Sequence, residues 1–357
     1  MNHRHSAAAL AAFGLLVILA AVGLWLTRGK PAPAPQLEDR KLALEDRECA
    51  CLLPGGDVLY VGGANGLYLL DAATFELKGQ IEIPGGPALQ LVSDLHKTPD
   101  GALWVAHNRG ISVRRGNEWK TFGKEDGLLD LRANCFCPVE DGLWAGTWGG
   151  AYFFAETPGG DYTVQKKYTM ENGLADNMVN AIHADGDGTL WFGAYYHSNT
   201  PCGLSILRDG QFSYLSVAQG LPHSFITSIC ALPDGAHYIG CGYLERGGLA
   251  VVRGQGEGFP VSRVYTENEG LPGPKVRSLF LDGERLWIAT ENDGILIVTN
   301  PKPNDLRLSG VYVKKENGLP DNEIKQIIEH DGYIYLAARR GVARLPAEAV
   351  ARYCAGG

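Results

Sequence analysis

Two closely spaced cysteine pairs are the feature of this chain that comes nearest to a chemical motif. Cys49 and Cys51 form one C-x-C pair, and Cys135 and Cys137 form another. Residues i and i+2 of a strand share one face, so each pair could offer two thiolates to a soft metal such as zinc or copper. Structural zinc sites more often use C-x₂₋₄-C spacing, and cysteine is commonly a small buried residue. We therefore expect buried thiols on strands, with no metal site and no cofactor.

Histidines and nucleophile motifs do not indicate catalysis. Nine histidines are spread along the chain, including His183 near the end of an expected strand and His330 in an expected turn. The sequence has no G-x-S-x-G, no H-E-x-x-H and no phosphate-binding glycine motif. We expect structural or solvent-exposed histidines and no catalytic residue. A lyase or hydrolase site assembled from single residues of different repeats would leave no motif, so that function remains a third alternative.

An internal repeat provides the scaffold for these residues. An aromatic residue followed by small and apolar residues returns every 40 to 49 positions, at Tyr60, Trp104, Trp144, Trp191, Tyr238, Trp287 and Tyr335. Asp-Gly pairs, which favour tight hairpin turns, precede most of these positions. Each copy has room for four short strands, and this period with four strands is typical of a propeller blade. We predict an all-β, seven-bladed β-propeller of four-stranded blades.

The ends of the repeat region predict how the ring closes. The seventh copy has only three expected strands, and an additional strand is expected at 40–44 before the first copy. We expect this strand to be the outer strand of blade seven, which removes exposed strand edges. The expected domains are an anchor at 1–27, a Pro/Ala linker at 28–36, the propeller at 37–346 and a C-terminal tail at 347–357.

A candidate disulfide joins two neighbouring blades. Cys202 ends a long loop of blade four, and Cys241 follows the aromatic strand of blade five. Face-to-face packing of the blades could bring these residues within the Cα separation of about 4.4 to 6.8 Å that a disulfide requires. Such a bond would form in an oxidising compartment.

Two of the copies resemble a known repeat family. Asn317-Gly318-Leu319-Pro320-Asp321-Asn322 with Ile324, Ile327 and Asp331-Gly332, and Asn172-Gly173-Leu174-Ala175-Asp176-Asn177 with Leu190-Trp191-Phe192-Gly193, resemble the two-component regulator propeller repeat. The resemblance covers roughly residues 40 to 346. It implies an extracytoplasmic sensing or binding propeller, as in membrane histidine kinases. The chain departs from that pattern because it contains one propeller and no kinase, response-regulator or Ig-like region.

The N-terminal region predicts a membrane anchor. Ala7 to Leu26 are twenty residues without charge, which is long enough to span the hydrocarbon core as a helix. A cleaved signal peptide is the alternative, but the apolar run is longer than the usual h-region and no A-x-A site follows it directly. We expect a single-pass protein of the inner membrane, with its propeller in the periplasm beyond a stiff Pro-Ala spacer at 31–35.

Two longer loops suggest a binding surface. Blade four inserts residues 195–201 and blade five inserts residues 243–246, whereas the equivalent loops of other blades are short. Loops held by a rigid scaffold often carry binding residues, and tyrosine and arginine are frequent in binding hot spots. The candidate binding residues on this face are Tyr195, Tyr196, His197, Tyr243, Glu245, Arg246, His107, Trp148, Glu291, Arg339 and Arg340.

Charge and composition narrow the function that these loops could have. The net charge is −8 and basic residues are not clustered, so nucleic-acid binding has no support. We predict a non-catalytic platform that binds another envelope or membrane protein. The alternative is a small-molecule sensor that binds a saccharide-like ligand and signals through a partner.

Overall fold

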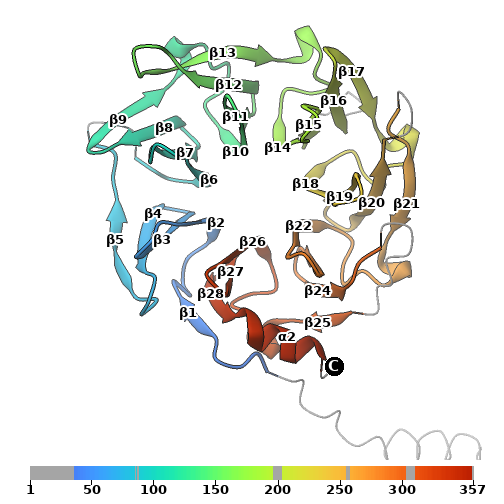
Figure 1. Ribbon diagram of the computed structural model, residues 1–357. Coiled ribbons are helices and arrows are strands. Elements are labelled where there is room, and N and C mark those ends of the chain that lie inside the picture. The colour runs from blue at the N-terminus through green and yellow to red at the C-terminus, as the bar shows by residue number, and fades with distance from the viewer. Residues whose placement is uncertain are drawn as a thin grey trace, which may run out of the picture. The chain divides into compact units, whose positions relative to one another are not determined.

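Seven four-stranded antiparallel sheets follow one another around a central axis and form a closed ring (Figure 1). The computed structural model describes residues 36–84, 86, 88–195, 203–254, 258–302 and 310–355. The predicted anchor and the Pro-Ala spacer lie outside these described residues. Within the described part of the chain, no helix is long and apolar enough to cross a membrane. The prediction of an all-β propeller with seven four-stranded blades is confirmed.

The strands of the first four blades follow sequence order from the central axis outwards. Blade one comprises β2 (Cys49–Pro54), β3 (Val58–Gly63), β4 (Gly66–Asp71) and β5 (Leu77–Ile81). Blade two comprises β6 (Val92–Lys97), β7 (Leu103–His107), β8 (Gly110–Arg115) and β9 (Glu118–Phe122). Blade three comprises β10 (Ala133–Val139), β11 (Gly142–Thr147), β12 (Gly150–Glu156) and β13 (Tyr162–Tyr168). Blade four comprises β14 (Val179–Ala184), β15 (Leu190–Ala194), β16 (Leu204–Arg208) and β17 (Gln211–Leu215).

The remaining blades continue in the same order, and a helix follows the last of them. Blade five comprises β18 (Ile226–Ala231), β19 (Ala236–Tyr243), β20 (Arg246–Arg253) and β21 (Val261–Tyr265). Blade six comprises β22 (Val276–Leu281), β23 (Arg285–Thr290), β24 (Gly294–Thr299) and β25 (Val311–Val313). Blade seven comprises β26 (Ile324–His330), β27 (Tyr333–Ala338), β28 (Gly341–Pro346) and β1 (Lys41–Ala43), and α2 (Ala347–Ala355) follows it. Short 3-10 helices connect blades at Lys124–Asp126, Met170–Asn172, Val217–Gln219, Glu267–Glu269 and Lys315–Asn317.

Pairing between the two ends of the propeller closes the ring. β1 is antiparallel to β28, with Lys41 opposite Arg344 and Ala43 opposite Val342. The Arg344 guanidinium also donates to the backbone carbonyl of Ala73 in blade one, at 3.1 Å. Blade seven therefore has four strands even though its last strand comes from the beginning of the domain.

The hydrophobic core consists of layers between neighbouring blades. All seven repeated aromatic residues are buried, and Trp104, for example, packs against Phe122 of its own blade and Phe154 of blade three. Each blade is a sheet with two apolar faces, and the preceding blade covers one of them while the following blade covers the other. The side chain of the repeated aromatic residue thus fills much of the space in each layer between blades.

A bulge near the start of every inner strand changes which way its side chains point. In β2 the pairing register shifts between Cys49 and Cys51, so one residue is extra and the alternation of faces is interrupted. Cys49 packs with Tyr335 of blade seven, whereas Cys51 packs with Val92 of blade two. The expectation that Cys49 and Cys51 share one face is therefore wrong.

Cys135 and Cys137 both follow the bulge of their strand and keep the regular alternation. Cys137 packs with Val179 of blade four. A Cβ built at Gly146, which is opposite Cys135, would contact both Cys135 Sγ and Val179, so Cys135 also lies near blade four.

Burial raises the pKa of the Cys49 thiol to about 12 and that of Cys137 to about 11. These cysteines are therefore protonated and unreactive at neutral pH.

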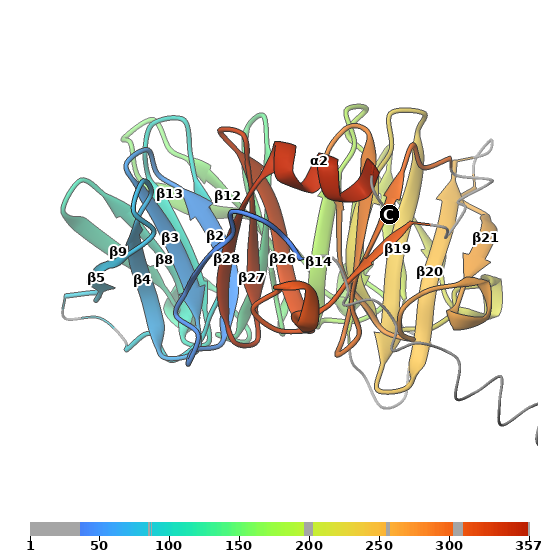
Figure 2. The same ribbon diagram turned by 90° about the horizontal axis from the view of Figure 1, so that it is seen from below.

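The two ends of the ring differ in the kind of connection they carry. We call the turn face the end with the hairpin turns between first and second strands, such as Asp100-Gly101 and Asp187-Gly188, whose glycines have φ of 90° and 85°. We call the loop face the opposite end, with the loops between second and third strands and the connections to the next blade. The α2 helix lies on the turn face, where the Ala347 N–H donates to the Gly332 carbonyl (Figure 2).

Candidate functional site

A hairpin of blade five extends the loop face. β19 and β20 contain eight residues each, and their pairing continues to Tyr243 opposite Arg246, which leaves only Leu244 and Glu245 in the turn. The extra residues expected here as a loop insertion therefore lengthen the two strands. A Cβ at Gly242 would lie 2.8 Å from Lys275 Cα, so glycine lets the hairpin pack tightly on the connection to blade six.

A buried lysine lies beneath this hairpin. Lys275 is nearly inaccessible, and its ammonium group forms an ion pair with Glu291. The same Nζ atom donates to the Tyr195 hydroxyl at 3.1 Å and lies 6.0 Å from the centre of the Tyr243 ring. A buried ammonium group needs such partners, because leaving it unpaired in the protein interior would be very unfavourable. Lys275 thus holds Tyr195 of blade four, Tyr243 of blade five and Glu291 of blade six together.

Aromatic rings complete this cluster. Phe225 lies between Tyr195 and Tyr243, with its ring centre 5.3 Å from each of theirs, and His223 packs on Phe225 at 4.8 Å. Burial, together with the charges of Arg246 and Lys275, lowers the pKa of His223. We call Tyr195, His223, Phe225, Tyr243, Lys275 and Glu291 the aromatic ledge.

Three members of the ledge were not predicted from the sequence. His223, Phe225 and Lys275 come from the connections between blades, at positions that follow the Gly220-Leu221 and Gly270-Leu271 pairs. The available signal was topological: in a propeller, these connections share a face with the loops between second and third strands.

The other predicted binding residues do not belong to the aromatic ledge. Glu245, Arg246, Arg339 and Arg340 are exposed on the loop face. Trp148 is partly exposed, and the Arg132 guanidinium lies 3.5 Å from its ring centre.

His107 is a structural histidine of blade two. It is fully buried, its Nε2 hydrogen-bonds to Ser112 Oγ at 2.9 Å, and its Nδ1 accepts from the Arg109 N–H at 3.2 Å. Burial lowers the pKa of His107 to about 4. Tyr196, His197 and Cys202 lie outside the described residues, and Cys241 is buried between blades four and five.

Exposed apolar side chains are concentrated on the loop face. Ten large apolar side chains of the described residues are exposed, and seven of them lie at this face, in its loops and connections or at the end of the blade-five hairpin. These seven are Leu91, Leu129, Trp148, Met170, Val217, Tyr243 and Leu244. The other three, Leu77, Tyr214 and Tyr312, lie on outer strands.

Leu244, at the tip of the blade-five hairpin, combines two unfavourable properties. Its side chain is 69% exposed, and its backbone φ is 51°, in the left-handed region. Residues other than glycine, asparagine and aspartate are disfavoured there because Cβ approaches the following carbonyl oxygen. Most other non-glycine residues with positive φ in the described chain are asparagine or aspartate. Folding alone would therefore favour a residue other than leucine at this position.

A second group of polar side chains lies in the groove between blades four and five, on the turn face. The groove is a cavity of about 660 Å³, lined by residues that include Arg208, Asp234, Arg253 and Phe259. On its wall, Asp185 Oδ1 accepts from His183 Nε2 at 3.2 Å and from His237 Nε2 at 2.8 Å.

The Asp185 carboxylate is held from a third direction as well. Its second oxygen, Oδ2, accepts from Trp191 Nε1 at 2.7 Å. Burial opposes ionisation of Asp185, but the hydrogen bonds from the two histidines and the tryptophan hold its pKa well below the usual range. The carboxylate is therefore ionised at neutral pH.

His183 was predicted to be an isolated histidine, and His237 was not among the predicted site residues. A signal was present in the internal repeat, because the position of His237, directly before the repeated aromatic residue, is aliphatic in all six other copies. The equivalent residues are Leu59, Leu103, Leu143, Leu190, Leu286 and Ile334.

Comparisons with known proteins agree with this architecture. Residues 173–196 match the family model described as two component regulator propeller. No curated protein sequence matches the chain. The solved structures that it resembles include the extracellular domain of a protein described as a hybrid two-component system from B. thetaiotaomicron, with 20% identity and a TM-score of 0.65 over 85% of this chain. This chain covers 40% of that one.

Two further structures have similar rings. Virginiamycin B lyase from Staphylococcus aureus is 15% identical, with a TM-score of 0.60, and the match covers 86% of this chain and 99% of the lyase. YCF48 from Cyanidioschyzon merolae is 10% identical, with a TM-score of 0.61, over 87% of this chain and 99% of YCF48. At these identities the similarity shows the fold alone. The chain thus contains one segment, residues 173–196, that matches the two-component regulator propeller repeat within a seven-bladed ring, which confirms the resemblance noted in its sequence.

Proposed function

We propose that this propeller binds a protein partner through its loop face, on the extracytoplasmic side of a membrane to which residues 7–26 anchor it. Leu244 is the observation that carries the proposal, because a highly exposed leucine in a left-handed backbone conformation has no benefit for folding. Unfavourable backbone conformations of this kind persist where function requires them. The leucine side chain at the tip of a rigid hairpin would be buried by a partner.

Other exposed residues of the loop face support a protein as the partner. Tyr243 is adjacent to Leu244, and Trp148 lies on the same face with its ring stacked by Arg132. Tyrosine, tryptophan and arginine are enriched among the residues that contribute most to protein–protein binding. The aromatic ledge fixes Tyr243 before binding, which reduces the conformational entropy lost when a complex forms.

The alternative function, a small-molecule sensor, has weaker support. A sensor for a charged or saccharide-like ligand would use Lys275 or Glu291 as a polar anchor. In this structure the two groups form an ion pair with each other, and Lys275 also donates to Tyr195. The ledge therefore offers ring surfaces more than free charge, which favours an apolar protein contact. The lyase alternative rests on similarity of fold alone.

The proposed location rests on two supports. The sequence of residues 7–26 is apolar and long enough for a membrane helix. The repeat family is typical of extracytoplasmic propellers. A structurally similar domain is extracellular in its own protein.

The test is a pull-down of the full-length protein from gently solubilised membranes, followed by native mass spectrometry. We expect a stoichiometric companion with the wild-type protein. Leu244→Asn should weaken its binding at least tenfold, because a buried apolar anchor is lost. The same variant should keep or slightly raise the melting temperature, since asparagine tolerates positive φ.

A matched control separates the loop face from general surface hydrophobicity. Leu77 is 51% exposed on the outer strand β5, so Leu77→Asn removes an exposed leucine far from the hairpin tip. This variant should retain the companion. Equal binding by Leu244→Asn and wild type would contradict the proposal. A wild-type chain without a companion would favour the sensor, and a thermal-shift screen of saccharides with residues 37–357 would then test that alternative.

A further inference from the structure

We propose that His183, Asp185 and His237 form a binding site for a divalent transition-metal ion such as Zn²⁺ in the groove between blades four and five. The three donor atoms, His183 Nε2, Asp185 Oδ1 and His237 Nε2, all lie within 4.8 Å of one another. Two ligands come from blade four and one from blade five, so a bound ion would join the two blades. The site is on the turn face and is independent of the partner-binding function proposed for the loop face.

The donor set and its spacing suit such an ion. Zinc binds imidazole nitrogens and carboxylate oxygens at about 2.0 to 2.2 Å, which places neighbouring tetrahedral ligands about 3.3 Å apart. Asp185 Oδ1 lies 3.2 Å from His183 Nε2 and 2.8 Å from His237 Nε2. Small side-chain rotations would bring these two separations to the required spacing, and the separation of the two histidine nitrogens is within 4.8 Å. Two imidazoles with one carboxylate favour transition metals over calcium or magnesium, which prefer oxygen ligands.

The position of His237 argues for a function beyond packing. It is nearly inaccessible at a position where each of the other six blades has leucine or isoleucine. A buried imidazole in place of an aliphatic side chain is unfavourable unless its polar atoms are satisfied. The Nδ1 atom of His237 has no hydrogen-bond partner among the described residues, so the site is not optimised for stability alone.

Trp191 orients two of the three ligands, Asp185 and His237. Trp191 Nε1 donates to Asp185 Oδ2 at 2.7 Å, which leaves Oδ1 directed toward the two histidines. The Trp191 ring also packs on His237, with ring centres 4.2 Å apart. Metal ligands are commonly held in this way by hydrogen bonds from a surrounding shell of residues.

The cavity leaves room for further ligands of the ion. His183, Asp185 and His237 line one wall of the space of about 660 Å³. Asp187 and Asp234 also line this space, but Arg208 and Arg253 line it too and offset their charge, with Arg253 paired to Asp234 at 2.6 Å. Three protein ligands beside an open cavity resemble metal sites that keep one position for water or an exogenous ligand.

The experiment is a titration of the full-length protein, free of tag histidines and stripped with EDTA, with Zn²⁺ alone. We expect one equivalent to bind saturably and to raise the melting temperature. Co²⁺ in place of Zn²⁺ should give the visible absorption bands of a tetrahedral site. His183→Gln and Asp185→Asn should each weaken Zn²⁺ binding on the order of 100-fold, since each removes a ligand.

Controls separate this site from other histidines and from loss of folding. His330→Gln removes a partly exposed histidine at the end of β26 in blade seven, next to Asp331, and should bind Zn²⁺ like the wild type. A double variant of His3 and His5 to glutamine should also bind like the wild type. His237→Leu should lose the Zn²⁺-dependent rise in melting temperature while remaining folded in EDTA. Absence of saturable binding, or wild-type binding by both His183→Gln and His237→Leu, would overturn the proposal and leave the cluster as a hydrogen-bonded link between blades.

Discussion

Two grooves of the ring contain the same pair of residues, a tryptophan and an aspartate. One groove lies between blades four and five and the other between blades six and seven, and they differ in the residues around this pair. In each, the repeated tryptophan donates from Nε1 to an aspartate of the turn face. Trp191 donates to Asp185 Oδ2 at 2.7 Å, and Trp287 donates to Asp282 Oδ2 at 2.9 Å. The two grooves therefore allow a direct comparison of the same local structure in two environments.

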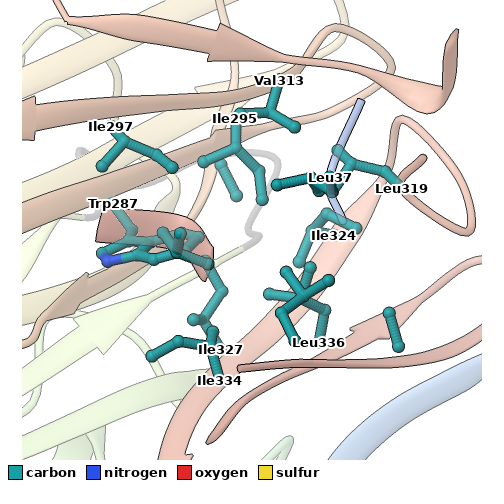
Figure 3. Close-up of a cluster of buried hydrophobic side chains, with 14 of the residues drawn as sticks. Leu37, Trp287, Ile295, Ile297, Val313, Leu319, Ile324, Ile327, Ile334 and Leu336 are labelled. Carbon is teal, nitrogen blue, oxygen red and sulfur yellow. The ribbon is translucent and has the colours of Figure 1, made fainter. Parts of the chain in front are cut away.

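In the groove between blades six and seven, the charge of the aspartate is neutralised and the tryptophan–aspartate pair is covered. The Asp282 carboxylate pairs with Arg285 Nε at 2.7 Å and is almost inaccessible. Ile334 of blade seven packs in the same hydrophobic cluster as Trp287, as Figure 3 shows. Val350 of α2 is fully buried in this cluster, so the C-terminal helix covers the groove.

In the groove between blades four and five, two histidines take the places of Arg285 and Ile334. His183 and His237 donate to Asp185 where Arg285 binds Asp282, and His237 replaces the aliphatic Ile334. The space beside them remains a cavity. The tryptophan–aspartate pair is thus common to both grooves, whereas the residues around it differ: apolar and paired side chains fill one groove, and histidines line the open space of the other.

Removal of the tryptophan should have the largest effect, and the effect should be greater in the covered groove. Trp287→Ala should lower the free energy of unfolding by about 3 to 5 kcal/mol, because it leaves a cavity beneath a helix. Trp191→Ala should destabilise somewhat less, because its groove is already open to solvent. Denaturant unfolding of both variants measures the difference. An equal or larger loss for Trp191→Ala would contradict the comparison, and a negligible loss in either variant would contradict the packing between blades.

Placing a histidine in the covered groove should be nearly as costly. Ile334→His puts an imidazole beside Trp287 and beneath α2, where Arg285 already occupies the aspartate. We expect a loss of about 2 to 4 kcal/mol in the free energy of unfolding, from lost apolar contacts and an unsatisfied polar group. Calorimetry would measure it. A well-tolerated Ile334→His would show that the identity of this residue does not distinguish the two grooves.

Neutralising the aspartate of the open groove should have a smaller effect that depends on pH. Asp185→Asn should cost about 1 to 3 kcal/mol at pH 7, because hydrogen bonds from the histidines and Trp191 lose their charged acceptor. The pKa of Asp185 is lowered in the folded protein, so its contribution is complete above its unfolded value of about 3.9. The difference from wild type should therefore shrink as the pH falls below about 4. A difference that persists unchanged at pH 3 would argue against the ionised carboxylate as its source.

Converting the open groove to the common aliphatic pattern should have the smallest effect. In the absence of metal, His237→Leu should change the free energy of unfolding by no more than about 1 kcal/mol, because leucine restores apolar packing while His183 and Trp191 still bind Asp185. Thermal unfolding in EDTA provides the measurement. A large loss in EDTA would show that His237 is required for folding and would remove the contrast with Ile334.

The fold could be predicted because its signals are local and repeated. Each blade is an antiparallel meander, and the position of Trp191 or Trp287 in its blade follows from nearby turns and alternating apolar residues. Closure by β1 was accessible for a related reason, since the seventh repeat lacks one strand. These features depend on neighbours in the sequence or on a simple count of strands.

The candidate sites could be predicted only in part. The blade-five hairpin was recognised from its extra residues, including Tyr243. Lys275, by contrast, lies 80 positions from Tyr195, whose hydroxyl it contacts. The His237 side chain reaches Asp185, 52 positions away, only because two blades pack face to face. No periodic pattern encodes such pairs.

The sequence by itself therefore determined the number of blades, the buried aromatic of each blade and the positions of the turns, because these depend on short-range hydrogen bonding and alternation. The tertiary structure alone decided which side chains of different blades meet. A single bulge in β2 places Cys49 and Cys51 on opposite faces of the strand, and this bulge is recognised only from the pairing of β2 with β3. Contacts between blades depend on the register and orientation of two sheets, and these are set by the packing of the whole ring.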